Sequence, residues 1–195
     1  MGKSRLEAFS DGVIAVIITI MVLDLKVPHG ESLDALSPVL PVFLVYVLSF
    51  VTVGIYWNNH HHMLHACERV TGPILWANLH LLFWLSLFPF TTAWMGENDF
   101  AATPAAIYGC VLLAAAISYV ILQQTIIRSQ GPDSLLRKAV GRDRKGKASA
   151  ILYVAAILAA LFISRWVAIG LYVLVAVIWF VPDRRIERTL GADGA

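Results

Sequence analysis

Charge is scarce in this sequence. Only 14% of its 195 residues are charged, where a soluble domain has about 25%, and the mean hydropathy is +0.72. Cysteine is scarce as well. Cys67 and Cys110 lie in or near different apolar runs, a placement that fits neither a disulfide framework nor a cysteine metal motif. No internal repeat and no nucleotide motif is visible. The composition therefore indicates an integral membrane protein.

The sequence contains long apolar runs. Six segments approach or reach the roughly 20 residues that a spanning helix needs. They are residues 8–25, 39–57, 73–95, 104–127, 148–164 and 166–182. The last two are short and predict a tight hairpin. The first is too long for a cleavable signal, so we expect it to be retained as a span. The predicted fold is one all-α domain, residues 1–195, with six transmembrane helices.

The placement of basic residues predicts the orientation. One side of the predicted spans holds 13 of the 15 Lys and Arg residues, whereas the other holds only Lys26 and Arg165. The 13 are Lys3, Arg5, Arg69, Arg128, Arg137, Lys138, Arg142, Arg144, Lys145, Lys147, Arg184, Arg185 and Arg188. We expect a multi-pass protein of the cell membrane with both termini cytoplasmic. The basic loop 128–147 predicts contact with anionic lipid. It has no aromatic residues for stacking, which argues against nucleic-acid binding.

The pattern R-x-x-x-F-S-D opens the first predicted span. It comprises Arg5, Phe9, Ser10 and Asp11. A carboxylate at the edge of hydrocarbon needs a partner, and such residues are functional candidates by default. The candidate partners are Arg5 and the end of the second span, namely Trp57, Asn58, Asn59, His60 and His61. We expect a satisfied polar network that fixes the packing of the first two spans.

An apolar stripe runs along the same span. At 100° per residue, one face carries Phe9, Gly12, Val13, Val16, Thr19, Ile20 and Leu23, with Ser10 and Asp11 away from it. Copies of the span around an axis would stack rings of Val16, Ile20 and Leu23 into a hydrophobic constriction. Thr19 would add a ring of oxygens, although threonine in a helix commonly bonds its own backbone. The alternative is that this face meets lipid or other helices.

Two further features are the histidines and Pro89. His61 and His65 have a spacing known from zinc sites, but no other ligand stands at the required spacing, so no metal is expected. His80 is expected to be a packed core histidine, and the cluster of histidines is a possible pH sensor. Pro89 lies inside the third span and predicts a kink, with Thr91 or Thr92 satisfying the freed backbone.

These motifs together resemble the transmembrane protein 175 family of potassium channels. The resemblance rests on R-L-E-A-F-S-D-G at 5–12, G-I-Y-W-x-N-H-H at 54–61, P-F-x-T at 89–92 and D-R-R-I-E-R at 183–188. It implies a homotetramer in which four first spans line the pore. It implies a constriction at Val16, further apolar layers at Ile20 and Leu23, and potassium preference from Thr19. Family members usually have Ile or Leu where this chain has the smaller Val16.

The resemblance thus predicts a potassium-permeable cation channel that conducts passively. The chain lacks a T-V-G-Y-G filter, and no span carries an arginine series typical of voltage sensors. Its expected partners are other copies of itself, monovalent cations and lipid, with no cofactor. The main alternative is a proton-permeable pathway or proton-coupled carrier that uses Asp11 and the histidines. A scaffold remains a third class, and no catalytic constellation supports an enzyme.

Overall fold

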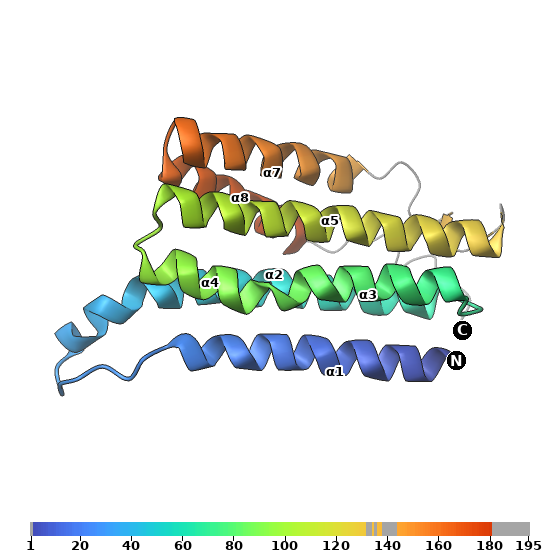
Figure 1. The fold of residues 1–195 in the computed structure, drawn as a ribbon, viewed down its shortest axis with the longest axis horizontal. Coiled ribbons are helices and arrows are strands. Elements are labelled where there is room, and N and C mark those ends of the chain that lie inside the picture. The colour runs from blue at the N-terminus through green and yellow to red at the C-terminus, as the bar shows by residue number, and fades with distance from the viewer. Residues whose placement is uncertain (1, 132–133, 135, 138–143, 181–195) are drawn as a thin grey trace.

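The computed structural model describes residues 2–131, 134, 136–137 and 144–180. Within these ranges all regular elements are helices (Figure 1). The elements are α1 (Lys3–Met21), η1 (Val22–Asp24), η2 (Leu33–Val39), α2 (Leu40–His65), α3 (Gly72–Ser86), α4 (Phe88–Glu97), α5 (Ala102–Gln130), α7 (Arg144–Phe162) and α8 (Arg165–Phe180).

Each predicted span coincides with a helix or a helical pair. In the described chain, five stretches are long and apolar enough to cross a membrane. The sixth, α8, has 16 residues and is about 24 Å long, somewhat short of a hydrocarbon core of about 30 Å. The all-α, six-helix fold class predicted from the sequence is therefore confirmed. Helix α2 runs further than predicted and ends at His65.

The third span is broken at Leu87, as Pro89 predicted. Pro89 lies in the first turn of α4, where its missing N–H costs little. The Leu87 amide donates to the Trp84 carbonyl at 3.3 Å, and the Thr91 hydroxyl donates back to the Leu87 carbonyl at 3.1 Å. Local backbone and threonine bonds thus satisfy the polar groups that the break exposes.

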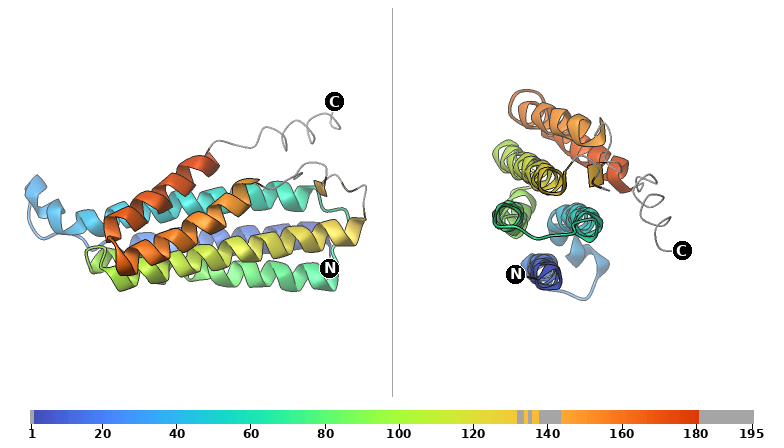
Figure 2. Two further views of the ribbon diagram at one scale, coloured as in Figure 1. Left: turned by 90° about the horizontal axis from the view of Figure 1, so that it is seen from above. Right: turned by 90° about the vertical axis from the view of Figure 1, so that its right-hand side faces the viewer.

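The helices form successive layers. In Figure 1, α1 lies along one side, α2 with α3 and α4 forms the next layer, and the α7–α8 pair packs on α5 and α2 on the side away from α1. Helix α1 packs mainly on α2, α3 and α4, whereas α7 packs on α5 and α8. Figure 2 shows α7 and α8 inclined to the longer helices. Because α1 is covered from one side only, its other side is left at the surface.

Small residues allow the outer helices to approach closely. Without a hydrophobic drive between helices in lipid, close packing is a main source of association. A Cβ added to Gly109 on α5 would lie 2.1 Å from the Tyr172 hydroxyl oxygen and 2.8 Å from Ile157 Cγ1. The Tyr172 hydroxyl donates to the Ala105 carbonyl at 3.0 Å. Gly109 therefore makes room for the contact of α5 with α7 and α8.

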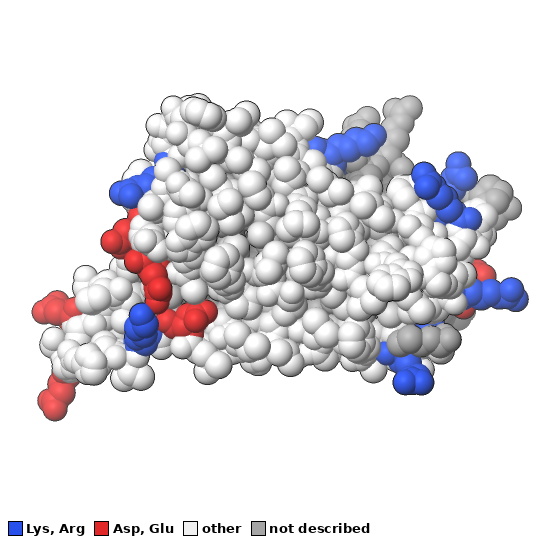
Figure 3. Space-filling view, in the orientation of Figure 1, with Lys and Arg blue, Asp and Glu red and all other residues white. Residues whose placement is uncertain are grey.

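Charge lies at the two ends of the helices. Figure 3 shows most of the visible Lys and Arg at the end where α1 begins, most of the visible Asp and Glu at the opposite end, and an uncharged belt between them. The acidic end includes Asp24, Glu97 and Asp99, near the end of α1. An uncharged belt between charged ends is what a membrane-spanning bundle requires.

Candidate functional site

Helix α1 has one face buried in the bundle and one uncovered face. Its buried side chains are Leu6, Ser10, Ile14, Ile17 and Met21. Its opposite face, continued by η1, carries Val16, Ile20 and Leu23, which are 53%, 44% and 78% exposed. Phe9 also lies on the exposed side. Most of the predicted apolar stripe is thus uncovered in the single chain, although Val13 is half-buried and packs against the core.

Asp11 is held by the second helix. The Trp57 indole N–H donates to Asp11 Oδ1 at 3.0 Å. Arg5 and Asn58 are exposed, and their predicted part in the network remains a prediction. The His61 ring lies beside that of Trp57, with centroids 6.3 Å apart. The sequence had left several candidate donors, and this contact selects Trp57.

A fully buried chain of hydrogen bonds lies one residue away from Asp11. His60 Nε2 lies 2.7 Å from Asn78 Oδ1, Asn78 Nδ2 donates to Ser10 Oγ at 2.9 Å, and Ser10 Oγ donates to the Leu6 carbonyl at 2.9 Å. Because the amide oxygen only accepts, Nε2 carries the proton. The chain joins α2, α3 and α1 through side chains that are at most 1% exposed.

Asn78 is the member of this network that the motif analysis missed. It lies in the apolar run of α3, outside every segment of the R-x-x-x-F-S-D and W-x-N-H-H patterns. A signal was present, because a carboxamide in the middle of a spanning helix is costly unless it is bonded. Its two partners come from the two predicted motifs, so Asn78 bridges them.

Further contacts anchor the ends of α1. Lys3 Nζ donates to the His65 carbonyl at 2.6 Å, which ties the start of α1 to the end of α2. At the other end, Thr92 Oγ1 lies 3.9 Å from Met21 Sδ and 2.7 Å from Ser49 Oγ. Ser49 also bonds the Tyr108 hydroxyl at 3.0 Å. Helix α1 is therefore fixed at both ends and in the middle.

Thr19 lies on the exposed face and bonds its own helix. Its hydroxyl reaches the Ala15 carbonyl at 2.9 Å and the Val16 carbonyl at 3.0 Å. The backbone bond that the sequence analysis allowed for is present. The proton is donated to the backbone, and the hydroxyl oxygen keeps its two acceptor lone pairs. The oxygen is still able to accept from water or to meet a cation.

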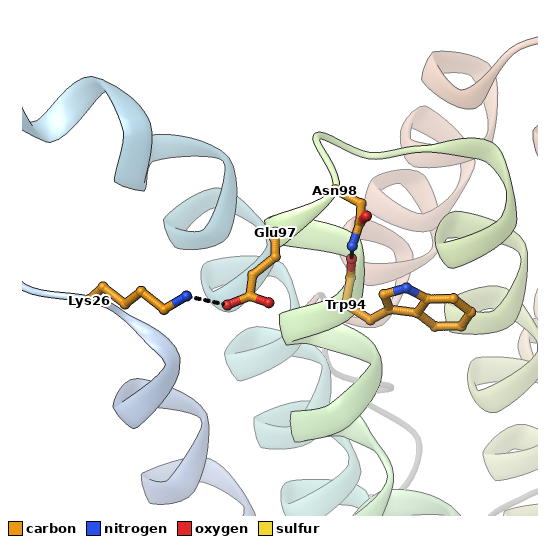
Figure 4. Close-up of polar contacts among 4 residues, drawn as sticks. All are labelled: Lys26, Trp94, Glu97 and Asn98. Atoms are coloured by element: carbon orange, nitrogen blue, oxygen red, sulfur yellow. Dashed lines mark hydrogen bonds and ion pairs between the residues drawn. The ribbon is translucent and has the colours of Figure 1, made fainter.

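The acidic end contains a cavity of about 760 Å³, lined by Asp24, Lys26, Glu97 and Asp99 among others. Lys26 Nζ pairs with Glu97 Oε1 at 2.8 Å, and Asn98 Nδ2 donates to the Trp94 carbonyl at 2.9 Å (Figure 4). The hydrogen bond and charge of Glu97 raise the pKa of Lys26 above its ordinary value. The pair ties the segment after α1 to the end of α4.

Of the remaining histidines, His62 is half-buried and the others are exposed. The rings of His61 and His65 are 6.3 Å apart, and in the part of the chain that the structure describes no three His, Cys, Asp or Glu side chains are grouped to hold a metal. The prediction for His80 was wrong, because the residue is exposed. It accepts from the Trp84 indole at 3.0 Å, within its own helix.

Similarity to known proteins extends over nearly the whole chain. Residues 5–89 match the family described as endosomal/lysosomal potassium channel TMEM175. A potassium channel of Chryseobacterium sp. (strain P1-3) is 56% identical over 190 residues, which are 97% of this chain and 98% of that relative. The human endosomal/lysosomal proton channel TMEM175 is 38% identical over 96 residues, which are 43% of this chain and 19% of the human protein.

The fold is also similar to a solved structure. The crystal structure of a lysosomal potassium-selective channel TMEM175 homolog from Chamaesiphon minutus matches it with a TM-score of 0.78 at 27% identity. The match covers 93% of this chain and 97% of the solved chain.

Proposed function

Because this chain belongs to the transmembrane protein 175 family, we propose that it is a potassium-permeable channel of the cell membrane whose pore is lined by α1. Its relative from Chryseobacterium is named a potassium channel, and the similar crystal structure is that of a potassium-selective channel. Both cover nearly the whole chain. Conduction is passive, and monovalent cations are the permeant ions.

One observation carries the pore assignment: α1 is anchored along one face and uncovered along the other. Ser10 and Asp11 on the anchored side are bonded to α3 and α2, whereas Val16, Ile20 and Leu23 are exposed. Hydrophobic rings of this kind gate by dewetting. The smaller Val16 predicts a wider first ring than Ile or Leu would give.

A single chain cannot enclose a pore with one helix face. Closed cyclic assemblies place the same surface of every copy around an axis. We propose a homotetramer in which four α1 helices surround the path of the ion, with both termini cytoplasmic. The Thr19 oxygens then form a ring beside the Val16 ring, and their lone pairs replace part of the ion's hydration shell. Ser10 and Asp11, bonded to Asn78 and Trp57, hold each helix in place.

A flux assay on protein reconstituted in liposomes tests this proposal. Wild type is compared with Val16→Asn and Leu23→Asn under a potassium gradient, with a sodium gradient beside it. We expect potassium flux above sodium flux, raised by either substitution because a polar ring stays wetted. Val154→Asn is the matched control, since Val154 is a comparably exposed valine on α7. Unchanged flux in both Val16→Asn and Leu23→Asn would contradict the proposal that α1 lines the pore.

A proton pathway is the second candidate function. The observation that favours it is the name of the human relative, a proton channel, although this chain spans only 19% of that protein. His60, Asn78 and Ser10 form a continuous bonded chain. Proton flux down an imposed pH gradient without potassium, abolished by His60→Gln but unaltered by Val16→Asn, would support the second function and count against the first.

A further inference from the structure

The described chain contains a second cavity, far from the exposed face of α1. It measures about 370 Å³ and lies between α2, α5, α7 and α8, within the range of small-molecule binding sites. Apolar and aromatic side chains make up most of its lining. They include Ile55, Ile117, Val120, Ile121, Tyr153 and Val175.

The cavity is elongated along the helix axes. On α5 it is lined from Ala116 to Gln124, which is about 12 Å at the rise of an α-helix. Ile117, Val120 and Ile121 are 36–49% exposed, so the cavity is open on its side, within the membrane-spanning part of α5. Such a shape suits one extended hydrocarbon chain that enters from the bilayer.

The end of the cavity near the start of α7 is polar and basic. Lys147 and Ser149 line it, and Trp179 Nε1 donates to Ser149 Oγ at 2.7 Å. Lys145 Nζ lies 5.9 Å from the centroid of the Trp179 ring. Tryptophan and lysine together at the boundary of a span mark the level of the lipid headgroups. The end of the cavity therefore carries positive charge at that level.

We propose that this cavity binds an anionic phospholipid, with one acyl chain between α5 and α8 and the phosphate at Lys147. Basic pockets between transmembrane helices bind anionic headgroups, and the apolar lining supplies the hydrocarbon part. A neutral lipid would satisfy the apolar part but would bring no net negative charge to Lys147. The site is separate from the pore face, so it stands whether or not α1 conducts.

Native mass spectrometry of the purified full-length protein tests the proposal. The protein is titrated with phosphatidylglycerol or with phosphatidylcholine of the same acyl chains. We expect wild type to retain more phosphatidylglycerol, and Lys147→Gln to lower that retention by about five-fold, toward the level of phosphatidylcholine. Arg128→Gln is the matched control, because Arg128 is an exposed cation at the same end of the molecule that does not line the cavity. It should leave retention unchanged.

Filling the cavity tests the hydrocarbon part separately. Ala150→Phe and Ala176→Leu each add a larger side chain to the lining, from α7 and from α8. If one of the two variants fails to fold, the other still tests whether the cavity is occupied. Either should lower the retention of both lipids. Equal retention of the two lipids by wild type, or no effect of Lys147→Gln, would overturn the proposal. A change in oligomeric state with unaltered lipid retention would assign the cavity to a second copy of the chain instead.

Discussion

The indole of Trp57 reaches across from α2 to the carboxylate of Asp11 on α1, with 3.0 Å between Nε1 and Oδ1. This contact, together with the buried chain through Asn78, fixes the rotation of α1 about its own axis. A rotation of one residue would turn Ser10 away from Asn78 and bring a different set of side chains to the uncovered face.

Loss of the Trp57 donor should loosen α1. Trp57→Phe removes a hydrogen bond to a charged group, and because Trp57 is 46% exposed we expect a modest loss of about 1 kcal/mol. Thermal unfolding monitored by chromatography in detergent measures it. Trp76→Phe serves as the control, since Trp76 is 74% exposed and its loss should change little. A double-mutant cycle of Trp57→Phe with Asp11→Ala that shows no coupling would contradict the contact.

Asn78 should be among the most sensitive polar positions. Asn78→Leu leaves the buried His60 Nε2–H without its acceptor, at about 1–3 kcal/mol for an unsatisfied group. It also removes the donor to Ser10 Oγ, which keeps its bond to the Leu6 carbonyl. We expect a lower unfolding temperature than that of Asn98→Ala, because Asn98 is exposed and bonds only its own helix. Adding His60→Leu should cost less than the sum of the two single changes. Strict additivity would show that the residues act separately.

Thr19→Val should alter ion preference without unfolding the protein. The bonds that are lost are local, to Ala15 and Val16 carbonyls, whereas the proposed ring of oxygens disappears. With potassium on one side and sodium on the other, we expect the reversal potential to move toward zero, the value for equal permeability to the two ions. Thr125→Val is the control, because Thr125 makes the same type of bond to Ile121 on α5. An unchanged reversal potential in Thr19→Val would show that the Thr19 hydroxyl does not set the preference for potassium.

Gly109→Ala should destabilise the outer helices. The new methyl group would lie 2.1 Å from the Tyr172 hydroxyl oxygen, so α8 has to shift, at a cost of about 1–3 kcal/mol for overpacking. Gly170→Ala on α8 meets nothing within 4 Å, and it should be neutral or stabilise the helix by about 0.5–1 kcal/mol. Thermal unfolding compares the two. Equal unfolding temperatures would mean that α8 adapts freely.

Much of the architecture follows from composition and periodicity. Apolar runs locate the spans because backbone groups in lipid leave few structures other than helices. Pro89 marks the break in the third span because its ring and missing N–H act locally. The stripe through Val16 and Ile20 was predicted to share one face because the period of a helix is fixed. Periodicity did not decide whether that face meets lipid, other helices or a central axis.

The choice of partners could not be read from the sequence. Asp11 had several candidate donors, and only the packing of α1 on α2 selects Trp57. Asn78 lies in a different helix from both its partners, and no local spacing reports a contact between elements. The exposure of His80 could not be read from the sequence either. A histidine in an apolar run suggests burial, but the rotation of α3 places it outside, next to Trp84.

The layered arrangement places α7 and α8 away from α1. The α7–α8 pair packs on α5 and α2, on the side away from α1. In a ring of subunits built around α1, the turn at Ile163 and Ser164 stands at the periphery, near the acidic ends of the helices. A fluorescent reporter inserted in that turn would allow the assembly of subunits to be followed in a living membrane without altering the face of α1.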